Sequence, residues 1–170
     1  MYRQRRGNLF DGVSRDGDRF IPPEGVVYCQ CISADAAMGA GIATTFNGFF
    51  DTRRKIQEIN KDLVDNGFDP ATVVGACVYQ EPVLCLVTKK VYWHKPTIST
   101  LAKALESAVD EVENLKLNTN IKEIRMPMIG CGLDKLQWER VLPELLKFAA
   151  ALELLNVDVT VIDFKLPSNM

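Results

Sequence analysis

The sequence predicts an α/β fold with a mostly parallel sheet that helices cover on both faces. Segments rich in β-branched and apolar residues alternate with segments of helical periodicity, which is the pattern of successive strand–helix–strand units. The run VLCLV at residues 83–87 is apolar without alternation, as expected of a central strand that is buried on both sides. With 170 residues, 47% of them hydrophobic, the chain is long enough to bury a core, and we expect a single domain over residues 1–170.

Five segments are predicted to be strands because they are short and rich in β-branched, aromatic or apolar residues. They lie at residues 26–32, 72–79, 83–88, 122–128 and 158–164. A turn at Glu81-Pro82 separates the second from the third. Residues 11–24 are rich in Gly, Asp, Arg and Pro, and they predict an extended surface loop.

Four segments are predicted to be helices. They lie at residues 39–50, 51–64, 97–117 and 136–155. The second and third show one apolar stripe with helical spacing. The stripe residues are Ile56, Ile59 and Leu63 in the second helix and Leu101, Leu105, Ala108, Val112 and Leu115 in the third. The fourth contains Pro143, which predicts a kink or a restart.

Composition and charge give no positive sign of several classes of partner. A net charge of −2 gives no sign of a nucleic-acid or membrane partner, and two basic clusters are expected to be solvated surface. These clusters are Arg3, Arg5 and Arg6, and Arg53, Arg54 and Lys55. The N-terminus MYRQRR lacks the apolar core of a signal peptide, and no apolar run is long enough to cross a bilayer. We therefore expect an intracellular protein, cytoplasmic or nuclear, with no membrane partner.

The cysteines favour a reducing compartment over a disulfide framework. There are five, an odd number without C-x-x-C spacing, and four fall in apolar segments where Cys acts as a small hydrophobic residue. Because His94 is the one histidine, we expect no Cys/His zinc site, and we expect no cofactor. The sequence does not determine the oligomeric state, although a monomer is favoured.

Two glycine-rich segments follow predicted strands and precede predicted helices. They are SADAAMGAGI (33–42) and IGCGLD (129–134). At such junctions free backbone N–H groups and the positive end of a helix face the crevice at the carboxyl edge of the sheet, and glycine lets the main chain approach a diphosphate. Either segment alone could serve only its turn. Together they favour a phosphate-bearing ligand, although neither matches a Walker or complete dinucleotide-binding motif.

Four motifs resemble the macrodomain branch of terminal ADP-ribose protein glycohydrolase. They are CISADAAMGAGIA (31–43), TKK (88–90), HKPT (94–97) and MPMIGCGLDKLQWE (126–139), and the similarity extends over about residues 26–161. The resemblance implies a three-layer α/β/α macrodomain with a mixed, mostly parallel central sheet. It also implies ADP-ribose, or a protein or nucleic acid that carries it, as the partner.

The resemblance implies that Lys89 is the nucleophile and Asp134 the acid/base. A neutral amine can displace an ester-linked carboxylate at the anomeric carbon. Because a free lysine has a pKa of about 10.4, this role needs partial burial or a neighbouring cation, and the end of a buried strand beside Lys90 offers both. Alternation along the strand allows only one of the two lysines to face the crevice. From the residues alone, the lysine pair is also compatible with a solvated strand end, and Asp134 with a helix N-cap in a capping box with Gln137.

The resemblance also assigns residues that bind ADP-ribose. These are Asn8, Leu9, Ser33, Asp35, Gly39, Ala40, Gly41, Ile42, Gly130, Cys131, Gly132 and Leu133. Asn8 replaces the family's aspartate, so its amide oxygen would accept from adenine without a charge. The family's tyrosine in the last strand falls at Ile162, so adenine stacking is lost or passes to Phe164. Trp93 and Trp138 are expected to be packing residues.

The implied activity is removal of ADP-ribose from acidic side chains of proteins, with O-acetyl-ADP-ribose and ADP-ribosylated nucleic acid as further substrates. Two other functions remain open. One is a reader module that binds ADP-ribose without turnover, and the other is a phosphatase acting on ADP-ribose 1″-phosphate. A nucleophilic pair of Cys131 with His94 is a further possibility.

Overall fold

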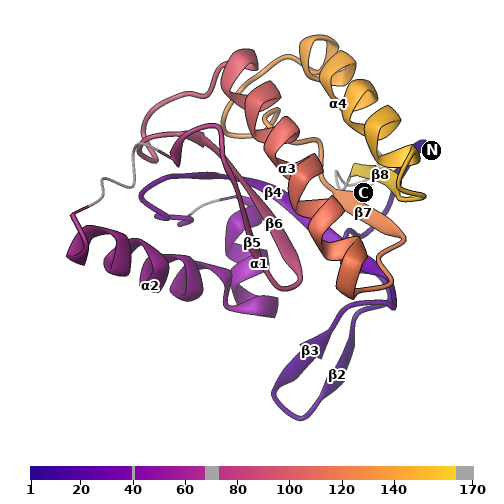
Figure 1. Cartoon of the computed structure of the whole chain (residues 1–170), viewed down its shortest axis with the longest axis horizontal. Helices are drawn as coiled ribbons and strands as arrows, with labels where there is room; N and C mark the ends of the chain where they lie inside the picture. The colour runs from indigo at the N-terminus through magenta and orange to yellow at the C-terminus, as the bar shows by residue number, and fades with distance from the viewer. Residues whose placement is uncertain (40, 68–72, 164–170) are drawn as a thin grey trace, which may run out of the picture.

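The computed structural model describes residues 1–39, 41–67 and 73–163, and it contains a six-stranded sheet (Figure 1). The strand order is β1-β8-β7-β4-β6-β5. The strands are β1 (Tyr2–Arg6), β4 (Val26–Ser33), β5 (Cys77–Gln80), β6 (Val83–Lys89), β7 (Glu123–Met126) and β8 (Asp158–Asp163). All neighbours are parallel except β5 and β6, so the sheet is mixed and mostly parallel, as the sequence predicts.

Helices cover both faces of this sheet. The first pair is α1 (Ile42–Phe50) and α2 (Thr52–Asp65), and the second pair is α3 (Ile98–Asn118) and α4 (Trp138–Glu153). In Figure 1, α3 and α4 lie together on the near face of the sheet. The core correspondingly consists of two clusters, one packed with α3 and α4 and the other with α1 and α2.

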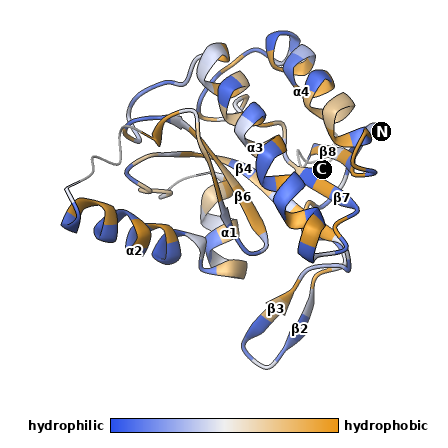
Figure 2. Cartoon of the chain, viewed as in Figure 1, coloured by the Kyte–Doolittle hydropathy of each residue, from blue (hydrophilic) through white to orange (hydrophobic). Residues whose placement is uncertain are grey.

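The central strands feed both clusters, which explains their unbroken apolar sequence. In β6, Leu84 and Leu86 belong to the α3–α4 cluster, whereas Val83, Cys85 and Val87 belong to the α1–α2 cluster. Successive side chains point to opposite faces, so a strand with helices on both sides needs apolar residues at every position. Figure 2 shows this centre as hydrophobic and the outer faces of the helices as largely hydrophilic.

Helix α3 is stabilised by an N-terminal cap and by burial of the predicted apolar stripe. Thr97 is its N-cap: the Thr97 side chain accepts a hydrogen bond from the backbone N–H of Thr100, and the Thr100 hydroxyl accepts one from the Thr97 N–H. The first four residues of the predicted stripe are buried and Leu115 is half-buried. Helix α4 runs through Pro143 without a restart.

Strand β1 is a feature that the sequence analysis did not predict. Tyr2–Arg6 pairs in parallel with β8 at the edge of the sheet, and its arginines are exposed. The N-terminal amine and Arg3 both contact the carboxylate of Asp158, at 3.1 and 3.3 Å. An edge strand needs little apolar surface, and charged residues on it discourage further pairing, so the segment carries no hydrophobic signal.

Two predicted strands are shorter than expected. In the segment predicted at residues 72–79, the strand β5 begins only at Cys77. Residue 72 lies outside the described part of the chain. Gly75 has a φ of +92°, which a strand cannot accommodate, and its N–H donates to the carbonyl of Val87 at 2.7 Å. The segment predicted at 122–128 is a strand only over Glu123–Met126, before Pro127.

The predicted surface loop at residues 11–24 is exposed and contains a small hairpin. Its strands are β2 (Ser14–Asp16) and β3 (Arg19–Ile21), which project from the body of the molecule in Figure 1. Phe20 contacts Phe49 of α1 edge to face, with 4.9 Å between ring centroids. Over the described residues, no helix combines the length and the apolar character that a membrane span requires.

We predict that Phe46→Ala lowers the free energy of unfolding by about 3–5 kcal/mol, because it leaves a cavity in the cluster under α1. Phe46 is buried, and its ring centroid lies 5.0 Å from that of Phe10 and 6.0 Å from that of Tyr28. Urea denaturation monitored by circular dichroism measures the change. Phe49→Ala, at a half-buried position on the same helix, is the control and should cost clearly less; equal losses would contradict this description of the core.

Candidate active site

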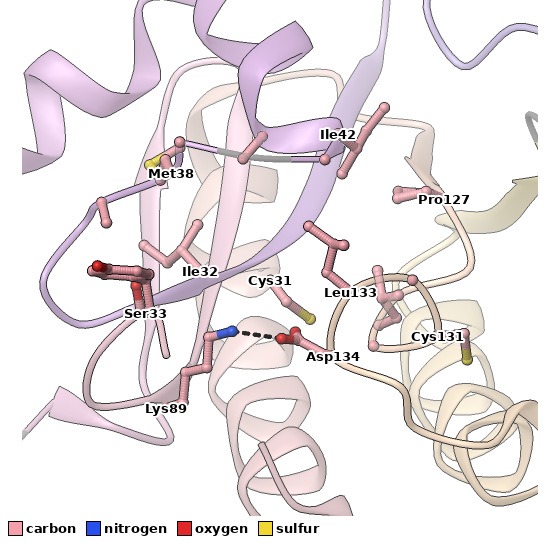
Figure 3. Close-up of a pocket in the computed structure, with 18 of the residues that line it drawn as sticks. Cys31, Ile32, Ser33, Met38, Ile42, Lys89, Pro127, Cys131, Leu133 and Asp134 are labelled. Atoms are coloured by element: carbon pink, nitrogen blue, oxygen red, sulfur yellow. Dashed lines mark hydrogen bonds and ion pairs between the residues drawn. The ribbon is translucent and has the colours of Figure 1, made fainter. Parts of the chain in front are cut away.

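The two glycine-rich loops and the end of β6 meet at one cavity of about 690 Å³ (Figure 3). Because β4, β6 and β7 are parallel, the loops that follow them leave the same edge of the sheet. A Cβ placed on Gly41 of the first loop would lie 3.3 Å from Leu133 Cδ1 of the second, so the two loops are in close contact. Among the predicted site residues, the cavity is lined by Ser33, Gly39, Gly41, Ile42, Lys89, Gly130, Cys131, Gly132, Leu133 and Asp134.

Lys89 and Asp134 form an ion pair at the wall of this cavity. Lys89 Nζ lies 2.5 Å from Asp134 Oδ1, and the side chains are only 13% and 15% exposed. Figure 3 shows the two side chains pointing toward one another from β6 and from the second glycine loop. Lys90 is exposed, so only one lysine of the pair enters the crevice, as alternation along the strand predicts.

Asp134 does not cap a helix, so the capping box proposed with Gln137 is wrong. Helix α4 begins at Trp138, and its N-cap Gln137 makes no side-chain capping bond. The residues before it form a tight turn, in which the N–H groups of Leu136 and Lys135 donate to the carbonyls of Gly130 and Gly132 at 2.7 and 3.1 Å. This turn delays the helix and leaves the carboxylate of Asp134 available to Lys89.

The first loop is shaped by Asp35, which does not itself line the cavity. The Ser33 hydroxyl donates to Asp35 Oδ1, which also accepts from the N–H of Ala37 at 3.2 Å. Such an Asx-type turn starts the loop directly after β4. Ser33 is buried and lines the cavity, whereas Ala40 lies outside the described residues.

Amide side chains of α1 and α2 support this loop from behind, and the sequence analysis missed them. Asn47 donates to the carbonyl of Met38 at 3.1 Å, Gln57 to that of Ala36 at 3.2 Å, and Asn60 to that of Ala34 at 2.7 Å. Ala36 and Met38 both have positive φ, at 53° and 47°, so the loop is held in a conformation that non-glycine residues rarely adopt. Polar amides beside the apolar face of α2 were the signal available in the sequence.

The residues predicted for adenine are not among those that line the cavity. Leu9 is buried in the cluster with Phe10 and Phe46, and Asn8 is exposed, with its Oδ1 accepting from the N–H of Phe10 at 2.9 Å. Ile162 is buried in the same cluster, and the next residue, Asp163, lines the cavity. Phe164, predicted as a substitute for the family tyrosine, lies outside the described residues. The adenine roles therefore stay predictions.

Three further side chains at the mouth were not expected there. Arg53 was assigned to solvated surface, but it lines the cavity, as do Tyr92 and Lys95 from the segment after β6. Trp93, predicted to pack, is 65% exposed, whereas Trp138 packs partly against the core. Because Trp93 lies in a loop, no helical or strand periodicity around it indicates whether its side chain is packed or exposed.

Cys31 and His94 give no support to a cysteine nucleophile at the site. Burial, followed by the nearby Asp134 carboxylate, raises the pKa of Cys31 well above its usual range, so that thiol is not activated as a nucleophile. His94 is exposed and does not line the cavity, whereas Cys131 does, which argues against the alternative in which these two residues form a nucleophilic pair. Within the described part of the chain, no group of three or more His, Cys, Asp or Glu could hold a metal ion.

The sequence is similar to two curated proteins of the same name. The ADP-ribose glycohydrolases OARD1 of Bos taurus and of Homo sapiens are each 38% identical over 127 residues, which cover 74% of this chain and 75% of the relative. No family model matches the chain.

Solved structures share the fold at much lower identity. The macrodomain of Thermus aquaticus DarG has a TM-score of 0.71 at 22% identity, covering 96% of this chain and 98% of its own. The macrodomain of Mycobacterium tuberculosis DarG has a TM-score of 0.70 at 18% identity, covering 97% and 99%. Thermosipho africanus DarTG in complex with ADP-ribose has a TM-score of 0.62 at 17% identity, covering 86% of this chain and 40% of that one. The fold is that of a macrodomain, with helices on both faces of a mixed sheet.

We predict that Gly130→Ala lowers the free energy of unfolding by about 1–2 kcal/mol, because Gly130 has a φ of +75° that disfavours a side chain. Its new Cβ would also lie 2.8 Å from Leu136 Cδ1. Gly132→Ala is the matched control in the same loop, since a Cβ placed on Gly132 has no atom within 4 Å, and it should change stability by less than about 0.5 kcal/mol. Denaturant titrations measure both. Equal effects would show that the turn does not depend on the Gly130 conformation.

Proposed function

Because the chain belongs to the macrodomain family, in the branch of the terminal ADP-ribose protein glycohydrolases, we propose that it is a hydrolase that releases ADP-ribose from a modified acceptor. The observation that carries this proposal is the Lys89–Asp134 pair at the wall of a cavity between two glycine loops. A module that only binds ADP-ribose needs the loops but not a shielded amine beside a carboxylate. We propose that residues 1–170 form one macrodomain.

The cavity suits a nucleotide diphosphate with a second ribose. Its volume of about 690 Å³ falls within the usual range for ligand pockets. Glycine at 39, 41, 130 and 132 gives the diphosphate access to backbone N–H groups, and α1 begins at Ile42 with its positive end toward the same loop. The cationic side chain of Arg53 adds charge complementarity at the mouth. The distal ribose would then lie near Lys89.

The reaction that this geometry suits is displacement at the anomeric carbon of that ribose. The unprotonated amine of Lys89 attacks C1″, a C–N bond forms, and the C–O bond to the acceptor carboxylate breaks with its electron pair leaving on oxygen. In the ligand-free pair Lys89 Nζ donates to Asp134 Oδ1, so this carboxylate is placed to take the proton that the amine must lose. Water then releases the sugar from Lys89, with Asp134 moving the proton.

We propose acidic side chains of proteins as the acceptor, with O-acetyl-ADP-ribose and ADP-ribosylated nucleic acid as further substrates. Esters suit the chemistry because the leaving carboxylate needs no proton to depart. We also propose an intracellular location, cytoplasmic or nuclear. The buried thiols of Cys29, Cys77 and Cys85 support it, because they act as core residues rather than as disulfide partners.

We predict that Lys89→Ala reduces release of ADP-ribose by at least about 100-fold, because it removes the nucleophile, while the affinity for free ADP-ribose changes only a few-fold. Asp134→Asn should also reduce turnover strongly. The measurement is loss of label from a protein automodified on glutamate by an ADP-ribosyltransferase, with calorimetry for binding. Lys90→Ala is the control, because this neighbour lies outside the cavity and its exposed charge is screened by solvent, so we expect no effect on Lys89.

Two results would replace this function with another. Label that remains on the acceptor with wild-type protein, together with tight ADP-ribose binding, would identify a reader. Release of inorganic phosphate from ADP-ribose 1″-phosphate that survives Lys89→Ala would identify a phosphatase.

We predict that borohydride added during turnover traps an adduct of the ADP-ribosyl group on Lys89, because a lysine bonded to the opened sugar passes through a reducible imine. Peptide mass spectrometry locates the adduct, and Lys89→Arg should remove it. Turnover at the normal rate without any adduct on Lys89 would rule out the lysine nucleophile and favour direct attack by water.

A further inference from the structure

The segment of residues 90–96, which we call the clasp, joins the two glycine loops across the mouth of the cavity. On one side the backbone N–H of Tyr92 donates to Asp35 Oδ2 at 3.3 Å. On the other side Lys95 Nζ donates to the backbone carbonyl of Leu133 at 2.8 Å. The clasp leaves β6 directly after Lys89, so the same stretch of chain that carries the amine also contacts both loops.

The Lys95 bond acts at the peptide group that precedes Asp134. The carbonyl of Leu133 belongs to the planar peptide group that links Leu133 to Asp134. A hydrogen bond that fixes this oxygen therefore restrains the orientation of the peptide plane that carries the Asp134 Cα, and with it the Asp134 side chain. The turn bonds of Leu136 to Gly130 and of Lys135 to Gly132 join the loop only to itself. Lys95, like Lys89 in its pair with Asp134, joins the loop to a different part of the fold.

The tip of the second loop, at Gly132 and Leu133, packs only lightly, because Leu133 contacts the first loop at Gly41 but is otherwise largely exposed. Leu133 is 61% exposed, and no atom lies within 4 Å of a Cβ placed on Gly132. The backbone that follows Lys95, by contrast, is conformationally restricted. Lys95 is followed by buried Pro96, whose φ is fixed by its ring, and by Thr97, the hydrogen-bonded N-cap of the long helix α3.

We propose that Lys95 is a positioning residue that holds Asp134 in hydrogen-bonding reach of Lys89. Its ammonium group donates a charge-assisted hydrogen bond, which is stronger than a neutral one. The kinetic consequence rests on the proposed hydrolase function, whereas the hold on the loop does not. Catalytic rates are sensitive to displacements of about 1 Å, so loss of this bond would act on the chemical step more than on ligand affinity.

The test compares Lys95→Met, Lys95→Arg and Lys90→Met. Methionine keeps an unbranched side chain but has no donor, arginine retains donors and charge, and Lys90→Met removes the same charge from an exposed neighbour. We expect Lys95→Met to lower the single-turnover rate at saturating substrate by about 10- to 100-fold, with Kd for ADP-ribose changed less than about threefold. Lys95→Arg should recover most of the rate, and Lys90→Met should keep it.

A second measurement is independent of turnover. In Lys95→Met, hydrogen exchange at the amides of Lys135 and Leu136 should become faster, because the turn that they close loses its external support. If exchange becomes faster but the wild-type protein shows no turnover, the restraint of Asp134 by Lys95 is supported while the proposed hydrolase function is refuted. Unchanged exchange with an unchanged rate would overturn the proposal. So would a rise in Kd that accounts for the whole effect, because Lys95 would then contact the ligand itself.

Discussion

The parallel pairing of β4, β6 and β7 is the constraint on which the site depends. Parallel neighbours end at the same edge of a sheet, so the Ser33 turn, the amine of Lys89 and the Asp134 turn meet there although about 100 residues separate the first from the last along the chain. The core maintains this register, because β4 and β6 present apolar side chains to helices on both faces. A slip of one residue along β6 would turn Lys89 away from the cavity and place a charge in the core.

At that edge, polar contacts add to the packing that anchors the two loops on the core. The first loop has residues with positive φ and is held by amides from α1 and α2, and the second is held by its own turn and by Lys95. Such contacts leave the cavity walls open to a ligand and still fix the main chain. The ion pair of Lys89 and Asp134 is nearly shielded from solvent, so each charge relies on the other until a substrate arrives.

Much of the sheet and of the site was predictable from the sequence because the relevant signals are local. Apolar runs located β4 and β6, and the glycine loops together with the TKK motif located the cavity. What failed depended on long-range geometry. Strand β1 has no apolar pattern, so the sequence alone does not reveal it; the strand is defined by its pairing with β8. The late start of α4 depends on a turn between Gly130 and Leu136, and no periodicity in the sequence encodes that turn. The supporting roles of Asn47, Gln57 and Asn60 likewise depend on where a loop 9 to 26 residues away comes to lie.

The exposure of Trp93 provides an optical probe of the mouth of the cavity. Trp93 is 65% exposed and adjoins Tyr92, a lining residue, whereas Trp138 packs partly against the core. Indole emission shifts to shorter wavelength as water is displaced from the ring. Trp93 is the more exposed of the two tryptophans, so its emission can shift further. Binding of a macromolecule at the mouth of the cavity can therefore be followed by intrinsic fluorescence, without a label and on the timescale of mixing.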